Sequence, residues 1–199
     1  KRGYFISGKF DQFKRNIPYA SLIQAFSSLM QQLLTESKIH LEQWRSKILA
    51  AVGANGQVII DVIPEVELII GKQPEVAELA GTEAQSRFNR VFVGFINVFA
   101  QRHHPLVIFL DDLQWADSAT LKLIQILTTD PESKHLLLIG AYRDNEVNPT
   151  HPLIQTLEEI EKNHSTINNI FLQPLGIPDV IELVAQTLNE NSERVNTLA

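Results

Sequence analysis

The sequence predicts an α/β fold in which a parallel sheet is covered by helices. Two short runs, residues 106–110 and 136–139, are apolar at every position, as strands buried on both faces are. Segments with the apolar spacing of a helix alternate with these runs along the chain. Such alternation is typical of parallel sheets, whose strands are joined by crossover helices.

The first half of the chain predicts one strand followed by helices. Residues 3–7, Gly-Tyr-Phe-Ile-Ser, are aromatic and β-branched and predict a strand. Apolar residues then recur with helical spacing over 19–34 and 41–52, and Gly53 stands where a C-terminal cap is expected. Between 53 and 81 the apolar segments are short and interrupted by proline and glycine, so we expect an insertion of short elements.

The second half has the clearest alternation. Thr82 with Gln85 predicts a capping box, and the apolar stripe from Phe88 to Phe99 predicts a helix that faces the core. Further elements are expected after the strand at 106–110, in this order: a helix around 121–127, a strand at 136–139, a helix around 153–160, a strand at 167–172 and a helix from about Pro178.

Composition excludes several classes of protein. With 199 residues, 44% of them hydrophobic, the chain can bury a sizeable core without a metal or disulfide staple. The formal net charge of −6 gives no electrostatic footprint for a nucleic-acid backbone. Cysteine is absent, which excludes disulfides, thiolate metal sites and a cysteine nucleophile. No apolar run approaches the roughly 18 residues of a membrane span, and we expect a cytoplasmic location.

Two adjacent acids, Asp111 and Asp112, directly follow the strand at 106–110. In open parallel sheets, ligands bind beyond the carboxyl ends of the strands. One well-known use of such acids is nucleotide hydrolysis, in which the first holds Mg²⁺ and the second orients or deprotonates the attacking water. Acids are also common as caps of the turn after a strand, and an apolar run followed by acids does not decide between the two roles.

Arg143 follows the second apolar strand in a comparable way. If the two strands are neighbours, this arginine reaches the same edge and can stabilise a γ-phosphate. The alternative is a surface ion pair with Asp144 or Glu146, which spacing alone slightly favours. Asp117 is expected to cap the helix that follows it, and Trp115 to be a partly buried anchor.

A second motif is interpreted as a chance match. Residues 3–9 satisfy G-x-x-x-x-G-K, but Phe10 stands where the phosphate loop requires Ser or Thr. Their Tyr-Phe-Ile centre predicts a strand, not a loop with exposed amides. His103 and His104 lack a third ligand at a sensible spacing, so no metal site is predicted there.

Two segments, "LVIFLDDLQWAD" (106–117) and "LIGAYRDNEV" (138–147), resemble the signal-transduction (STAND) branch of the AAA-like P-loop ATPases. The likeness runs through most of the chain. The segments "GYFISGKFDQFKRNIPYASLIQAF", "GQVIIDVIPEVELIIG" and "THPLIQTLEEI" are similar to the ATPase module of large bacterial, notably cyanobacterial, signalling proteins. Those proteins join a serine/threonine kinase-like domain, this ATPase, sensor domains and a histidine kinase.

The resemblance implies ATP and Mg²⁺ as cofactors and a role for four residues. Asp111 matches the Walker B acid that holds the metal, and Asp112 the adjacent catalytic acid, where the commonest ATPases have glutamate. Arg143 matches the sensor arginine. Pro174 lies where the family's core passes into its helical lid, and we place it with Asp111 among the cofactor-binding residues.

The same resemblance implies a three-layer P-loop NTPase fold that begins after the family's first strand. Residues 1–175 then form a partial core with an insertion at about 53–81, and residues 176–199 start the helical lid. The family's phosphate loop has no counterpart in the sequence. We therefore expect this segment alone to bind ATP poorly and not to hydrolyse it.

Two functions are compatible with these features. The first is part of an ATP-driven switch, with neighbouring kinase and sensor domains and a nucleotide-dependent oligomer as partners. The second is a catalytically inactive, ATPase-like scaffold for the same kinase domains. A metal-dependent nuclease is disfavoured by the acidic balance and by the lack of a third clustered acid.

Overall fold

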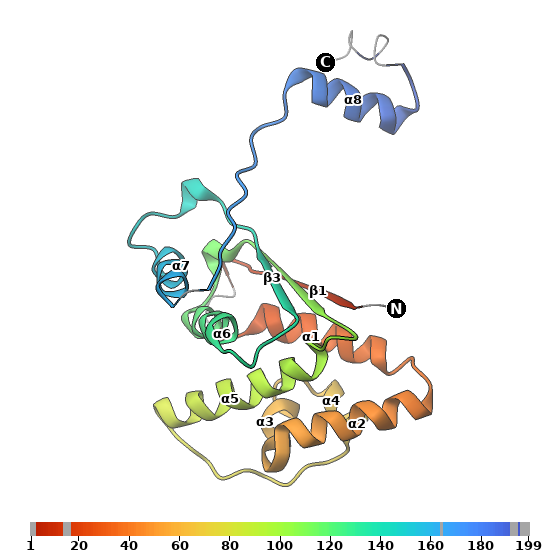
Figure 1. The fold of residues 1–199 in the computed structure, drawn as a ribbon, viewed down its shortest axis with the longest axis vertical. Helices are drawn as coiled ribbons and strands as arrows, with labels where there is room; N and C mark the ends of the chain where they lie inside the picture. The colour runs from red at the N-terminus through yellow and green to blue at the C-terminus, as the bar shows by residue number, and fades with distance from the viewer. Residues whose placement is uncertain (1–2, 14–16, 164, 192–194, 196–199) are drawn as a thin grey trace. The chain divides into compact units, whose positions relative to one another are not determined.

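The computed structural model describes residues 3–13, 17–163, 165–191 and 195, in two compact units, Lys1–Thr166 and Ile167–Ala199. The first unit is built on a parallel sheet with strand order β1-β2-β3 (Figure 1). The strands are β1 (Tyr4–Lys9), β2 (Leu106–Asp111) and β3 (Leu136–Gly140). The predicted α/β class and its parallel sheet flanked by helices are confirmed.

The helices of this unit follow the predicted order. They are α1 (Ala20–Leu33), α2 (Lys38–Val52), α3 (Gly56–Ile60), α4 (Glu65–Ile70), α5 (Gly81–Phe99), α6 (Ser118–Thr129) and α7 (Pro152–Lys162), with short 3₁₀ turns η1 (Gly53–Asn55), η2 (Leu113–Trp115) and η3 (Asp144–Glu146). The segment expected to hold short elements contains η1, α3 and α4. Gly53 ends α2 with φ 53°, which confirms the predicted C-terminal cap.

The core lies between the sheet and the apolar stripes of α1 and α5. Leu106, Ile108 and Leu110 of the central strand are fully buried. Aromatic rings from both helices pack against one another, with Phe95 5.6 Å from Phe26 between ring centroids. Helix α1 also lies close to β1 at Gly8. A Cβ atom added there would lie 2.4 Å from the Ser21 carbonyl oxygen, so the close approach requires glycine.

The predicted capping box at Thr82 is wrong. Helix α5 begins at Gly81, and its N-cap residue Ala80 offers no side chain to the first turn. Instead of folding back, the Gln85 amide contacts the Tyr19 hydroxyl and Asn89 Oδ1. The Gln85 side chain is therefore engaged in tertiary contacts and is not available for the capping box.

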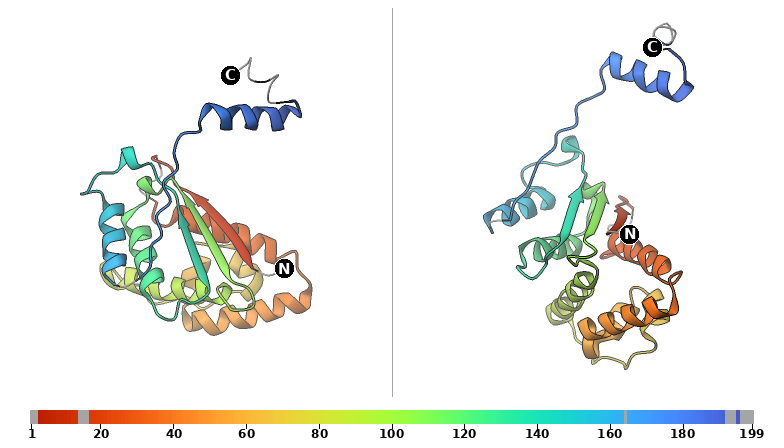
Figure 2. Two further views of the ribbon diagram at one scale, coloured as in Figure 1. Left: turned by 45° about the horizontal axis from the view of Figure 1, so that its top comes forward. Right: turned by 45° about the vertical axis from the view of Figure 1, so that its right-hand side comes forward.

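The expectation that the strands are buried on both faces holds for one face only. Ile108 lies on the face of the sheet that the helices cover. Val107 and Phe109 lie on the opposite face, and so do the residues of β1 and β3 that pair with them. On that opposite face Phe5 is 64% exposed, Leu137 55% and Ile139 40%. Figure 2 shows the three strands and the helices of the first unit in two further views.

The second unit contains α8 (Ile177–Leu188), as expected from the pattern after Pro178. The strand predicted at 167–172 is not formed, and Ile170, Phe171 and Leu172 are all exposed. A strand needs a partner for its backbone groups, and in the described chain β3 pairs only with β2. Among the described residues, no helix combines the length and apolarity that crossing a membrane demands.

Candidate functional site

Both predicted acids lie at the carboxyl end of the central strand. Asp111 is the last residue of β2, and its side chain is partly exposed. Asp112 follows with a left-handed backbone, φ 55° and ψ 43°. This turn carries its carboxylate into a buried position, where 8% of the side chain is exposed. Aspartate tolerates the left-handed region better than most residues, and the bonds to the carboxylate hold the conformation.

Lys9, from the neighbouring strand β1, joins the two acids. The strand register places Lys9 opposite Asp111. Its Nζ lies 2.7 Å from Asp111 Oδ2 and 2.8 Å from Asp112 Oδ2. The hydrogen bond from Lys9, helped by one from Gln114, lowers the pKa of Asp112 although burial opposes this. The bond to Asp111 in turn raises the pKa of Lys9.

Arg143 reaches the same edge from the other side, because β3 is the next strand. Its Nε lies 3.8 Å from Asp112 Oδ1, while its Nη1 donates to Glu146 Oε1 at 2.9 Å. The guanidinium carbon also lies 5.7 Å from the centre of the Trp115 ring. Arg143 therefore forms the ion pair with Glu146 and also reaches the edge that carries the acids, while its role toward a γ-phosphate stays a prediction.

Gln114 links these groups from a buried position in η2. Its Nε2 donates to Asp112 Oδ1 at 3.0 Å, and its Oε1 accepts the Arg143 backbone N–H at 3.3 Å. The residue is 2% exposed. Asp112 is therefore surrounded by donors from β1, from η2 and from the segment after β3.

Sequence reasoning missed both Lys9 and Gln114 as site residues. Lys9 was considered only as part of the loop-like motif, which the structure confirms to be strand β1. A signal for Lys9 was present, because a cation that ends a strand parallel to the acid-bearing one reaches the same edge. Gln114 had no such signal, since its role depends on the turn made at Asp112.

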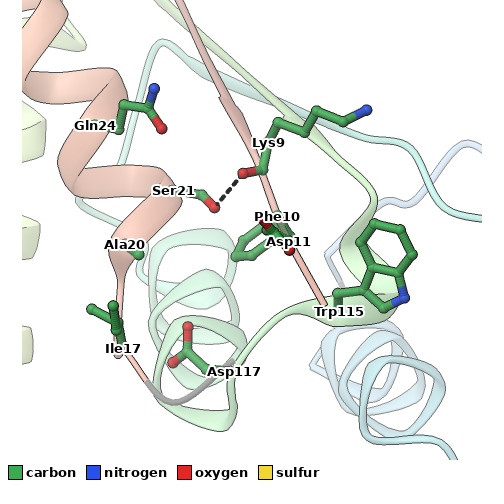
Figure 3. Close-up of a pocket in the computed structure, with 9 residues that line it drawn as sticks. All are labelled: Lys9, Phe10, Asp11, Ile17, Ala20, Ser21, Gln24, Trp115 and Asp117. Carbon is green, nitrogen blue, oxygen red and sulfur yellow. Dashed lines mark hydrogen bonds between the residues drawn. The ribbon is translucent and has the colours of Figure 1, made fainter. Parts of the chain in front are cut away.

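Asp117 and a neighbouring pocket complete this edge. Asp117 caps α6 by accepting from the Thr120 N–H at 2.8 Å, as predicted, and also accepts the Tyr19 N–H at 3.3 Å. A pocket of about 390 Å³ lies between Lys9, the first turns of α1 and Trp115 (Figure 3). Its wall is fixed where the Ser21 hydroxyl donates to the Lys9 carbonyl oxygen at 2.9 Å.

The acid pair fits a divalent cation such as Mg²⁺. One oxygen of each carboxylate lies within 2.8 Å of the Lys9 ammonium, so both converge on a single positive centre. Mg²⁺ is usually held by one or two carboxylates together with water and substrate phosphates. In the part of the chain that the structure describes, no group of three or more His, Asp or Glu side chains is arranged to hold a metal. Asp111 would therefore be its protein ligand, with Asp112 beside it, and Lys9 would have to give up at least one contact.

Pro174 belongs to the second unit, and the acids belong to the first. It lies between the exposed residues that follow 167 and the start of α8. Its assignment to the cofactor-binding residues stays a prediction.

Replacing Lys9 by Met is expected to raise the pKa of Asp112 toward its ordinary value, because the Lys9 bond is the largest influence that lowers it. A carboxyl group whose pKa is lower in the folded than in the unfolded chain stabilises the fold above the unfolded-state pKa. That stabilisation is lost as the pH falls through the folded-state pKa. The Lys9→Met chain should therefore lose less stability on acidification. Carboxyl ¹³C NMR titration and urea unfolding across the acid range measure both effects.

The matched control is Lys162→Met, which removes a surface lysine that lies 3.8 Å from Glu158 on the same helix. This change should leave the Asp112 titration where it is in the wild type. An Asp112 pKa that is equal in the Lys9→Met and wild-type chains contradicts the prediction.

Comparison with known proteins identifies one matching family and two relatives. A family model described as the AAA ATPase domain matches residues 1–139. A hybrid signal transduction histidine kinase G from Dictyostelium discoideum is 43% identical over 123 residues, which are 62% of this chain and 4% of that protein. Histidine protein kinase 1 from Candida albicans is 21% identical over 213 residues, which cover 94% of this chain and 8% of that protein.

The chain thus spans a small fraction of each curated relative it matches, 4% and 8% of their lengths. No solved structure matches it significantly. The matched family region contains β1, β2 and most of β3, and therefore includes Lys9 and both acids. Arg143 lies just beyond it.

Proposed function

Because the chain belongs to the AAA ATPase domain family, we propose that it is part of an ATP-driven switch in a larger signalling kinase. Both relatives are named as histidine kinases, and the chain matches only a small part of each. We assign it to the STAND branch because of two sequence segments, 106–117 and 138–147, which contain the carboxyl ends of β2 and β3. Kinase and sensor domains of the same protein are then its partners. The proposal also includes oligomers of the protein that form in a nucleotide-dependent way.

One observation supports this function most strongly. Two carboxylates, one at the end of β2 and one directly after it, and a guanidinium from the segment after β3 converge at the carboxyl edge of one parallel sheet, with Arg143 Nε 3.8 Å from Asp112 Oδ1. Ligands bind at this edge in open α/β sheets. A pair of acids beside a cation suits Mg²⁺-bound phosphate, since one acid can hold the metal, the other can face the attacking water, and the cation can bind phosphate oxygens.

Each residue then has a separate role. Asp111, the more exposed acid, holds Mg²⁺, which when bound neutralises phosphate charge. Asp112 orients the attacking water and accepts its proton. Arg143 exchanges its contact with Glu146 for oxygens of the γ-phosphate, so that its position reports whether that phosphate is present.

The scaffold is the second candidate, and one observation favours it. Lys9 contacts both carboxylates at once, so its ammonium group supplies the positive charge that a metal ion would otherwise bring to them. In a scaffold this ion pair would be permanent and the domain would act through its surfaces alone. The switch requires Lys9 to yield when Mg-nucleotide binds.

Arg143→Ala is expected to remove the preference for ATP over ADP in the full-length protein. A switch acts only through a difference in affinity between its nucleotide states. A hydrogen bond to a charged group contributes about 1.5–3 kcal/mol, or roughly 10–100-fold in affinity. Equilibrium binding of ATP and of ADP, each with Mg²⁺, should therefore show a wild-type preference of that order and near equality in the variant.

The control is Arg87→Ala, which removes an arginine of α5 that donates to the Ala77 carbonyl oxygen and does not face the acids. It should keep the wild-type preference. If the wild-type protein binds neither nucleotide, or binds both equally, the switch is rejected and the scaffold is retained.

A further inference from the structure

The Gln114 side chain lies between two groups with opposite hydrogen-bonding needs. The Asp112 carboxylate only accepts, and the Arg143 backbone N–H only donates. The Gln114 amide satisfies both, at 3.0 Å from Asp112 Oδ1 and 3.3 Å from the Arg143 nitrogen. Glutamate, which has nearly the same shape, can accept from Arg143 but offers Asp112 a second negative charge. Leucine offers neither bond.

This link is not needed to hold the two chain segments together. The backbone already joins them, because the Leu113 N–H donates to the Ala141 carbonyl oxygen at 2.9 Å and the Ala141 N–H to that of Leu110 at 2.8 Å. A buried amide is costly to place unless its bonds are made. What Gln114 adds to these backbone bonds is therefore an orientation for the Asp112 carboxylate and a link from that carboxylate to the Arg143 backbone, beside the 3.8 Å approach of the Arg143 Nε to Asp112 Oδ1.

The backbone of Asp112 makes such an orientation necessary. Its left-handed conformation turns the side chain out of the strand direction and toward the neighbouring strands. On one side Lys9, a flexible side chain that is largely exposed, contacts the carboxylate. On the other side Gln114 is buried and is held at both ends, so it is the rigid partner of the two.

We propose that Gln114 is a positioning residue that orients the Asp112 carboxylate and couples it to the backbone of Arg143. A displacement of Arg143, as when it turns to a phosphate, is then transmitted through one side chain to the group that faces the attacking water. This inference rests on the proposed function for the roles of Asp112 and Arg143. The link itself is independent of that function.

The first test uses NMR on the chain without nucleotide. As Asp112 titrates, the Gln114 side-chain NH₂ and the Arg143 backbone N–H resonances should shift with the same midpoint as its carboxyl carbon. In Gln114→Leu the Arg143 resonance should no longer follow that midpoint. In Gln114→Glu, the added carboxylate should move the Asp112 midpoint to higher pH. Gln125→Leu, a change in a half-buried glutamine of α6 that pairs with Lys122 and Glu159, is the matched control and should alter none of these signals.

The second test is a double-mutant cycle on ATP turnover by the full-length protein. Gln114→Glu should lower kcat about 10-fold or more, as expected when a charge-assisted hydrogen bond is lost, and leave KM for ATP near the wild-type value. In the Asp112→Asn background, the same change should have almost no further effect, because a residue that acts through Asp112 has nothing left to position. A merely structural role would instead give additive losses.

The outcomes separate this inference from the proposed function. An Arg143 resonance that ignores the Asp112 titration in the wild-type chain overturns the coupling, whether or not ATP is hydrolysed. Additive losses in the cycle overturn the positioning role. The third outcome combines the two tests. If the full-length protein hydrolyses no ATP, but the chain shows the linked titration and its loss in Gln114→Leu, the proposed function is rejected and the link is supported.

Discussion

Replacing Asp112 by Asn is expected to lower ATP turnover by the full-length protein by roughly 10²–10⁴-fold, the usual contribution of a general base. Asparagine keeps the shape of the side chain and an oxygen that can accept from Gln114 or Lys9. It removes the charge that, in the proposed function, takes the proton of the attacking water. The loss should therefore fall on kcat, with nucleotide affinity close to that of the wild type.

Steady-state turnover and equilibrium nucleotide binding together measure this effect. The control is Asp144→Asn, which changes an exposed acid in η3, next to Arg143 in sequence. It should hydrolyse ATP at nearly the wild-type rate. An Asp112→Asn protein with wild-type kcat would show that Asp112 is not the catalytic acid.

Phe95→Ala is expected to reduce the free energy of unfolding by about 3–5 kcal/mol, as is typical for a buried phenylalanine. Phe95 is fully buried, and its ring centroid lies 5.2 Å from that of Phe99 and 5.6 Å from that of Phe26. The change removes aromatic contacts between α1 and α5 and leaves a cavity that rigid neighbours cannot fill. Such a loss is a large part of the roughly 5–15 kcal/mol that stabilises a typical domain.

Urea unfolding of the chain measures the loss, and Phe13→Ala is the matched control. Phe13 is 84% exposed, so its truncation should change the free energy of unfolding by no more than about 0.5 kcal/mol. If the two variants unfold at the same urea concentration, the aromatic stripe of α5 is not the core of the first unit.

The elements that bury a continuous apolar pattern were predictable from sequence. The stripe of α5 has the helical period, and the runs that form β2 and β3 are short and apolar at every position, a pattern typical of strands in a parallel sheet. Once the strands are taken as neighbours in a parallel sheet, it follows that Asp111, Asp112 and Arg143 share an edge. The candidate site was therefore largely predictable as a set of chain segments.

The failures have a common physical cause, because each depends on a partner that local sequence does not specify. The apolar residues Ile170, Phe171 and Leu172 have strand character but no strand to pair with among the described residues. Gln85 has the right spacing for a capping box, but the Tyr19 hydroxyl takes its amide. Local propensity is overridden in both cases by which groups come together in space.

The interior of the site could not be read from sequence for the same reason. The contact of Lys9 with both acids depends on the register of β1 against β2, in which Lys9 faces Asp111. The role of Gln114 depends on the left-handed turn at Asp112, which no motif specifies. Of the five polar side chains that form the site, Asp111, Asp112, Arg143, Lys9 and Gln114, the last two were thus found only in the structure.

We propose that the acid pair acts on Mg-ATP, with Asp111 binding the metal and Asp112 facing the attacking water. The sharpest test is ATP turnover by the full-length protein with and without the Asp111 carboxylate. Asp111→Ala removes the more exposed carboxylate, the one assigned to the metal. We expect Mg²⁺-dependent turnover by the wild-type protein and loss of that turnover in the variant, with the exposed-acid change Glu132→Gln as the control. Turnover that is unchanged in Asp111→Ala would contradict the proposal.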